Sequence, residues 1–363
     1  MSVTQQMVRL TALSHGAGCA CKLSLDELTG LLGRVALGQH PDLVVGAGTG
    51  DDAAVWRQRD GRLLVATTDF FKPLVDDPFT WGQIAAANAV SDVYAMGAEP
   101  RFALNLVGWP RDLDFGLLEQ VLAGATSVAD KAGYPLVGGH TIDSAEPLYG
   151  QVVIGEVGER NLLTNAGARP GQALVLTKPI GTGIAVTAAK RSDPEAVEAD
   201  TPLGRAFRAA VASMIRLNRC ASQVATEFHA TAATDVTGFG LLGHLHRLAA
   251  ASGVTCQLDS ARVPLLPGVE ALVDEGFVPG GTRRNVEQSA RFVRGSVDLP
   301  TRTLLCDAQT SGGLLIACAE RDAPAVHAVL GSRGHDAAII GAVLPADSTT
   351  GEPGTIHLGA LPA

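Results

Sequence analysis

Aspartates at the ends of turns and strands are the residues of this sequence whose types and spacing best suit chemistry. Asp51 and Asp52 follow a glycine-rich turn, Asp69 closes the apolar run LLVATTD, and Asp235 lies in TDVTGFG. Oxygen ligands from several separate turns are what Mg²⁺ takes when it bridges a protein to a polyphosphate. Taken singly, an aspartate in a turn or before a helix is more often a cap, and that alternative stays open for each of them.

Asp92 differs from these residues because it lies inside a helical pattern flanked by Ala, Val, Tyr and Met. It follows Asn88 by four residues, which places both side chains on one face of a helix. A carboxylate in such surroundings needs a hydrogen-bonding partner or a metal ion if it is buried. The sequence has neither the GxxxxGK[ST] motif nor the protein-kinase motifs, so the phosphates of a bound nucleotide would be held in another way.

A cysteine–lysine segment, HGAGCACK over residues 15–22, offers a second kind of chemistry. Cys19 and Cys21 lie beside Lys22, and a nearby cation favours the thiolate, which is the reactive form of cysteine and suits soft partners. The alternatives are a solvent-exposed loop with incidental thiols and half of a zinc site, although no Cys/His pair with matching spacing follows.

The segment GGHTID, residues 138–143, is a candidate for phosphate contact. Its two glycines would let backbone N–H groups approach an anion closely. Without other context, an ordinary tight turn is the better interpretation of this segment. A lone histidine such as His140 is more often a structural hydrogen-bonding group than a catalyst.

Strands and helices must position these residues, and the apolar patterns predict a mixture of both on either side of a loop-like stretch at 160–172. Each half has one strand ending in Thr-Asp, at Thr68-Asp69 and Thr234-Asp235, which is a weak sign of two similar layered units. The tail after residue 344 is expected at the surface. We predict strands at 62–68, 102–107, 148–158, 173–179, 254–258, 302–306, 313–319 and 337–343, a strand followed by a turn at 135–141 and at 231–240, and helices at 79–97, 115–132, 181–190, 203–228, 241–251 and 321–332.

Composition favours an α/β protein of about two domains, because the 363 residues are 46 % hydrophobic but only 4 % aromatic. With 28 Lys+Arg against 37 Asp+Glu and no dense basic run, we expect no nucleic-acid partner. The absence of an apolar run of ~18 residues predicts no membrane span. The N-terminal residues lack the pattern of a secretory signal, and the six scattered cysteines favour a reducing, cytoplasmic setting.

Taken together and in order, the segments resemble the selenophosphate synthetase (selenide, water dikinase) family of the aminoimidazole ribonucleotide synthetase-like superfamily. The matching stretches run from residue 9 to about residue 315. The cysteine–lysine segment separates this family from aminoimidazole ribonucleotide synthetase, thiamine-monophosphate kinase and a hydrogenase maturation protein. The stretches are RLTALSHGAGCACK, GDDAAV, TTDFFKPLVDDPFTWGQIAAANAVSDVYAMGAEP, GGHTID, LTKPIGTGI, TDVTGFGLLGHL, LPGVE, VPGGTRRN and CDAQTSGGLL.

The resemblance implies that ATP, selenide and water give selenophosphate, AMP and orthophosphate, which would supply activated selenium for selenocysteine and selenium-modified tRNA synthesis. It implies several Mg²⁺ ions per site, K⁺, a homodimer with ATP sites near the subunit interface, and a selenium-delivery protein as a further partner. It also implies the two-domain α/β (α+β) fold of the superfamily. In this scheme residues 1–22 are a flexible Gly-rich arm, 23–160 an ATP-binding domain whose strands build a β-barrel in the dimer, and 171–345 a C-terminal α/β domain.

Residue by residue, the resemblance makes Cys19 the catalytic cysteine and Lys22 an essential lysine that contacts the ATP phosphates. It places Mg²⁺ on Asp52, Asp92 and Asp235. It places the nucleotide and its metal ions at Thr49, Gly50, Asp51, Asp69 and Asp92, with Gly139, His140 and Thr141 reaching ATP from the neighbouring subunit.

Three positions depart from the family pattern. Gly50 precedes the aspartate pair where a basic residue is common, so a side-chain phosphate contact is expected to be absent there. Ala20 replaces a common glycine between the cysteines, and Ala308 replaces a proline. The competing interpretations are another ATP-using enzyme of the superfamily that yields ADP, a catalytically silent binding or regulatory paralogue, and a two-domain protein whose aspartates are only caps.

Overall fold

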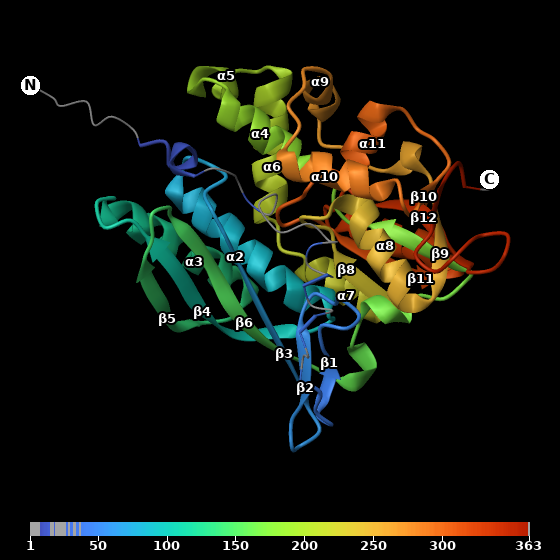
Figure 1. The fold of residues 1–363 in the computed structure, drawn as a ribbon. Helices are drawn as coiled ribbons and strands as arrows, with labels where there is room; N and C mark the ends of the chain where they lie inside the picture. Colours follow the sequence, from blue (N-terminus) through green and yellow to red (C-terminus); the bar gives the residue numbers. More distant parts are fainter. Residues whose placement is uncertain are drawn as a thin grey trace, which may run out of the picture.

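The computed structural model describes residues 8–14, 18, 27, 30–31, 34–35 and 38–361. Its strands form two sheets that lie side by side, with helix α2 (Pro78–Ala95) between them (Figure 1). The first sheet has the strand order β1-β2-β3-β6-β4-β5. Its strands are β1 (Leu43–Val45), β2 (Ala54–Arg57), β3 (Leu63–Phe71), β4 (Glu99–Trp109), β5 (Leu136–Asp143) and β6 (Leu148–Val157).

The second sheet has the order β10-β13-β9-β12-β7-β11-β8, so β8 lies at one edge. Its strands are β7 (Gln172–Leu176), β8 (Ala232–Asp235), β9 (Val254–Leu258), β10 (Val293–Arg294), β11 (Leu314–Ala319), β12 (Ala338–Pro345) and β13 (Ile356–Leu358). The other α-helices whose bounds the structure describes are α3 (Phe115–Ala132), α4 (Thr182–Arg191), α5 (Pro194–Glu198), α6 (Pro202–Ile215), α7 (Arg219–Glu227), α8 (Gly240–Ser252), α9 (Val269–Asp274), α10 (Gly280–Ser289), α11 (Leu299–Leu305) and α12 (Ala323–Ser332).

Helices α2 and α3 cover one face of the first sheet and lie against each other (Figure 1). Helix α2 begins at a cap in which the Asp77 side chain accepts a hydrogen bond from the Thr80 backbone N–H at 2.8 Å. Two glycines let the helices approach, because a Cβ at Gly82 or Gly124 would overlap a backbone carbonyl of the other helix. This close approach fixes α2, and therefore the side chains it carries, against the sheet.

The opposite face of the first sheet is apolar, and no other described part of the chain covers it. Strand register places Phe70, Phe102 and Ile142 on this face, where they are 51 %, 37 % and 56 % exposed. We call it the open face of the first sheet. An apolar sheet face of this kind is typical of an interaction surface.

The second sheet is covered on both faces, as its sequence dictates. Strand β7 is buried throughout, with Leu174 and Leu176 in one core and Val175 in another. The first core includes side chains of α8, and the second includes side chains of α7 and α12. A strand that is buried on both sides needs a continuous apolar run, and QALVL provides it.

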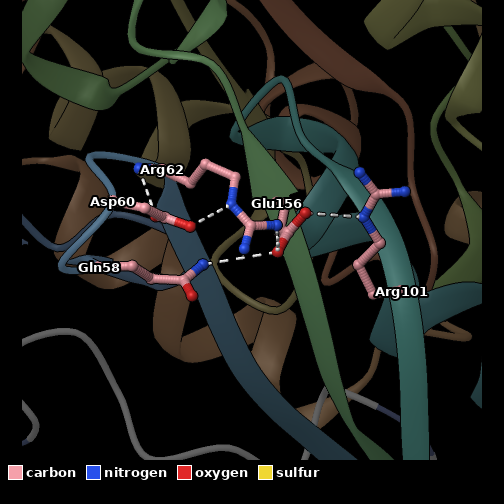
Figure 2. Close-up of polar contacts among 5 residues, drawn as sticks. All are labelled: Gln58, Asp60, Arg62, Arg101 and Glu156. Carbon is pink, nitrogen blue, oxygen red and sulfur yellow. Dashed lines mark hydrogen bonds and ion pairs between the residues drawn. The ribbon is translucent and has the colours of Figure 1, made fainter.

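A polar network ties the β2–β3 hairpin to the neighbouring strands at the end of the first sheet (Figure 2). Glu156 of β6 accepts hydrogen bonds from Arg62 at 3.0 Å, from Arg101 at 3.0 Å and from Gln58 at 3.4 Å. The Arg62 backbone N–H donates to Asp60 at 3.1 Å and its side chain donates at 2.8 Å, and these two hydrogen bonds lower the pKa of Asp60. These ion pairs are largely exposed, so each contributes little to stability.

Several sequence predictions about elements are wrong. Residues 302–306, predicted as a strand, lie in and just after α11, because a short apolar run does not distinguish a strand from a buried helix. The helix predicted at 203–228 is two helices, α6 and α7, with a break between them. The tail after residue 344 is not only surface, since β13 pairs with β9 and buries Ile356. Strand β3 continues beyond Asp69 to Phe71.

Among the described residues, none of the helices combines the length and the apolar character that crossing a membrane requires.

Candidate active site

Hydroxyl groups link the three aspartates that the sequence predicts as Mg²⁺ ligands. Asp52 precedes β2, Asp92 lies on α2 and Asp235 ends β8, so the residues come from both sheets and the helix between them. Thr234 donates to Asp52 Oδ1 at 3.0 Å, and Ser91 donates to Asp235 Oδ2 at 2.6 Å. We call Asp52, Asp92 and Asp235 the carboxylate site.

Thr67 of β3 completes the connection between these aspartates. Its hydroxyl contacts Asp92 Oδ2 at 2.5 Å and the Asp52 carbonyl at 3.4 Å. Asn218 adds a further link, because its side-chain amide donates to the Ser91 hydroxyl and to the Gly312 carbonyl, each at 2.8 Å. The structure therefore joins residues that lie more than a hundred positions apart in one hydrogen-bonded arrangement.

Asp52 has the most unusual surroundings of the three. Its Oδ2 atom is buried and has no hydrogen-bond partner among the residues that the structure describes. Burial, followed by the charge of Asp235, raises the pKa of Asp52 well above its usual value. A buried carboxylate oxygen without a partner is costly, and a second carboxylate nearby adds repulsion. A cation at this place would relieve both effects.

The carboxylate site fits a cation that is shared with a ligand. Within the described part of the chain, no three His, Cys, Asp or Glu side chains lie close enough together to hold a metal ion alone. Mg²⁺ is commonly held by one or two carboxylates together with substrate phosphates and water. The unpartnered Asp52 Oδ2 and the adjacent Asp235 carboxylate supply a donor set of that kind.

Asp69 takes part in a second polar arrangement next to the carboxylate site. It is 7 % exposed and accepts a hydrogen bond from the Asn88 amide at 2.7 Å. The Asn88 side-chain oxygen accepts from the Ser311 backbone N–H, also at 2.7 Å. Asn88 thus joins Asp69 of β3 to the loop before β11. It lies on α2, one helical turn before Asp92.

Thr49, Gly50 and Asp51 form the turn that leads to Asp52. The Asp51 carboxylate accepts from the Asn165 backbone N–H at 2.5 Å and also contacts the Thr49 hydroxyl. The Asn165 amide donates to the Gly50 carbonyl at 2.9 Å. These contacts of Asp51 hold the turn of residues 49–52 against Asn165, in the connection between the two sheets.

Gly139, His140 and Thr141 lie apart from the carboxylate site within one chain. They belong to β5, at the opposite edge of the first sheet from β1 and β2, with three strands in between. At ~4.8 Å per strand the separation of β2 and β5 is roughly 19 Å. Gly139 has a structural reason to be glycine, because a Cβ there would overlap the Asn105 carbonyl. Residues 136–143 are a strand and not the predicted strand followed by a turn.

Cys19, Cys21 and Lys22 lie outside the described residues, so the structure does not place them. The segment before them is held at two points. Asp76 accepts hydrogen bonds from Arg9 and Thr11, and Lys190 donates to the Ser14 carbonyl at 2.7 Å. Gly18 lies against Thr310, next to the loop residue that contacts Asn88, and a Cβ at Gly18 would overlap the Thr310 hydroxyl.

Sequence reasoning missed the hydroxyl and amide residues that hold the aspartates. Ser91 and Thr234 each stand next to a predicted ligand in the sequence, so adjacency was a usable signal for these two residues. Thr67 and Asn218 had no such signal.

Two surface cavities lie elsewhere, one beside His246 and Phe292 and one beside Arg111. No residue of the carboxylate site lines either cavity.

Two family descriptions match most of the chain. "AIR synthase related protein, N-terminal domain" matches residues 50–157, and "AIR synthase related protein, C-terminal domain" matches residues 169–352. The chain is also similar to a solved structure of "Hydrogenase Maturation Protein HypE in complex with ATP", with a TM-score of 0.58 and 22 % identity. That likeness covers 93 % of this chain and 94 % of the other, and it confirms the predicted two-domain α/β fold.

Two relatives in bacteria are similar along nearly their whole length. A protein of Myxococcus xanthus named "Selenide, water dikinase" is 47 % identical over 360 residues, which is 98 % of this chain and 99 % of the relative. A protein of Paraburkholderia xenovorans with the same name is 45 % identical over 343 residues, covering 93 % of this chain and 95 % of the relative.

Proposed function

The chain belongs to the selenide, water dikinase family, and we propose that ATP, selenide and water react at its carboxylate site. The products are selenophosphate, orthophosphate and AMP. One phosphoryl group of ATP is transferred to selenide, the other is transferred to water, and AMP is the nucleotide that remains. The observation that supports this site most directly is the buried Asp52 Oδ2 atom, which has no hydrogen-bond partner among the described residues and faces a second carboxylate charge.

Asp52, Asp92 and Asp235 are the residues that would hold Mg²⁺ together with the triphosphate. When bound, Mg²⁺ neutralises charge that develops on the transferred phosphoryl groups. The chain's own contribution is to fix the carboxylates, through Thr234 on Asp52, Ser91 on Asp235 and the Thr67 hydroxyl on Asp92. Asp69 would lie close to the bound nucleotide. We propose K⁺ as a further ion of the site, as in the family that the sequence resembles.

Cys19 and Lys22 complete the proposal as the catalytic cysteine and the phosphate-contacting lysine of a Gly-rich arm at residues 1–22. The position of Gly18 against Thr310 supports this role, because Thr310 neighbours Ser311, which contacts the Asn88–Asp69 pair. Cys19 follows Gly18 directly and Lys22 is four positions after it, so both are tethered to a point close to the expected surroundings of the nucleotide. Lys22 would offset phosphate charge, and a covering arm would exclude water from the first transfer.

A homodimer formed through the open face would bring Gly139, His140 and Thr141 to the neighbouring subunit's ATP. Strand register places His140 in the same row as Phe70, on the open face. Burying this apolar face between two copies would close the two first sheets into a barrel, the arrangement that we propose for residues 23–160. Residues 171–345 would then form the C-terminal domain of each subunit.

A reducing, cytoplasmic setting suits the thiols of the described residues. Cys256, Cys306 and Cys318 are free and buried, and burial raises their pKa values to about 12, 12 and 11. Buried thiols of this kind are inert and need no disulfide. Selenide delivered by a partner protein would be compatible with this setting.

Phosphorus NMR under anaerobic conditions tests the reaction. With ATP, Mg²⁺ and selenide we expect selenophosphate, AMP and orthophosphate in equal amounts, formed only when selenide is present. ADP as the final nucleotide would contradict the dikinase reaction. In the same assay Cys19→Ser should remove selenide-dependent turnover while nucleotide binding persists, and Cys21→Ser is the matched control. Unchanged turnover in Cys19→Ser would refute the role of Cys19.

A further inference from the structure

Arg247 brings a positive charge from α8 to the turn that precedes Asp52. Its Nη2 atom donates to the Gly50 carbonyl at 2.7 Å. Its guanidinium carbon lies 5.2 Å from the centre of the Phe239 ring, a distance that allows a favourable cation–π contact. The side chain is partly buried, and the charges of Asp52 and Asp51 oppose the effect of burial, which lowers the pKa of Arg247.

The Arg247 guanidinium packs directly against the Cα of Gly50, which only a residue without a side chain allows. Gly50 has φ +64°, and a Cβ at this position would overlap the Arg247 guanidinium. A side chain at residue 50 is therefore excluded both by backbone conformation and by space. The place that a side chain of residue 50 would enter is filled by the guanidinium of residue 247, from the other half of the chain.

The turn of residues 49–52 is otherwise held by neutral groups and carries two carboxylates. Asn165 shares the Gly50 carbonyl with Arg247, and Thr234 binds Asp52. Asp51 and Asp52 together with Asp235 would repel a triphosphate unless positive charge offset them. Arg247 interacts with both Asp51 and Asp52, so it is placed to supply part of that charge in the absence of ligand as well as in its presence.

We propose that Arg247 is a positioning residue for nucleotide binding, which fixes the Gly50–Asp52 turn and offsets its negative charge so that Mg·ATP can bind. This inference rests on the proposed function. It gives α8 a role in the site, although Arg247 lies two residues beyond the motif TDVTGFGLLGHL and outside every other motif of the sequence.

The test compares Arg247→Met, which keeps an extended side chain next to Phe239 without charge, with Arg247→Lys, which keeps the charge. Binding of ATP in the presence of Mg²⁺ is measured by isothermal titration calorimetry, and turnover gives KM and kcat separately. We expect Arg247→Met to raise both Kd and KM for ATP about tenfold, equivalent to about 1.4 kcal/mol. We expect kcat at saturating ATP to change less than threefold, and Arg247→Lys to recover most of the affinity.

Arg62→Met is the matched control, since Arg62 is an exposed arginine at the far end of β3 (Figure 2). It should leave ATP affinity unchanged. Arg247→Met with wild-type Kd and KM would overturn the inference while leaving the proposed function intact, provided that Asp52→Asn loses binding. A fall in melting temperature and kcat without a change in Kd would also overturn it, since that result indicates a purely structural role. Wild-type protein that binds no Mg·ATP would overturn both.

Discussion

Replacing Asp52 by asparagine separates a structural aspartate from a metal ligand, because the two roles predict opposite changes in stability. The asparagine side chain would keep an oxygen for the Thr234 hydrogen bond, but the substitution would remove a buried charge that lies next to Asp235. The amide NH₂ group would take the place of Oδ2 and would still lack a partner among the described residues, but it carries no charge to be desolvated or to be repelled by Asp235, a difference of about 1–3 kcal/mol. We therefore expect the metal-free variant to be more stable than the wild type by a similar amount, which raises the melting temperature by a few degrees.

The stabilisation by ligand should change in the other direction. A nucleotide present at about 100 times its Kd stabilises the wild-type protein by about 2.7 kcal/mol, and the variant should lose this gain. Differential scanning fluorimetry with and without ATP and Mg²⁺ measures both effects, and Asp60→Asn at an exposed site is the control.

The pH dependence of the metal-free proteins gives an independent check. Because the folded-state pKa of Asp52 is raised, the folded wild type binds more protons than the unfolded chain above pH ~4, so its stability falls as pH rises through that pKa. The gain of Asp52→Asn should therefore grow with pH. A variant that melts well below the wild type and retains its full ligand-induced shift would refute the assignment of Asp52.

Three further predictions concern the surroundings of the site. Ser91→Ala removes hydrogen bonds to Asp235 and from Asn218, so we expect a loss of about 2–3 kcal/mol in urea unfolding and weaker Mg·ATP binding; wild-type values for both would contradict the network. Gly124→Ala should destabilise the protein by about 2–3 kcal/mol because its Cβ overlaps the Phe79 carbonyl, whereas Gly158→Ala, with open space around it, should not; equal effects would contradict the close approach of α2 and α3. Burial lowers the pKa of Lys178 to about 7, so from pH 7 to 10 the unfolded chain binds more protons and wild-type stability should rise relative to Lys178→Met; parallel melting curves across this range would show that Lys178 is charged in the folded state.

The long periodic elements could be predicted from the sequence, because local patterns determine them. The predicted bounds of helix α3 and of strand β9 match the observed ones, since each is a single amphipathic or apolar segment with clear ends. The strand prediction fails at helix α11 because three consecutive apolar residues, Leu304, Leu305 and Cys306, show no period. Strands β1, β10 and β13 are two or three residues long, too short for a periodic pattern, and the pairing of β10 and β13 depends on partners far along the chain.

The candidate site could be predicted as a set of residue types but not as a geometry. The Thr-Asp pairs at 68–69 and 234–235 are visible in the sequence, and the structure links the second sheet to the residue before β2 through the Thr234 hydroxyl on Asp52. The contacts of Asn88 with Asp69 and Ser311, and those of Arg247 with Gly50, involve separations of 19 to 223 positions. No local pattern carries information at that range, so those contacts needed the fold.

The most direct test of the carboxylate site is a crystal structure with Mn²⁺ in place of Mg²⁺ and a non-hydrolysable ATP analogue, with anomalous scattering used to locate the metal. We predict anomalous peaks at about 2.0–2.2 Å from carboxylate oxygens of Asp52 and Asp235, with phosphate oxygens completing the coordination and Asp52 Oδ2 among the ligands. Peaks bound elsewhere, with Asp52 Oδ2 still lacking a partner beside a bound nucleotide, would contradict the account.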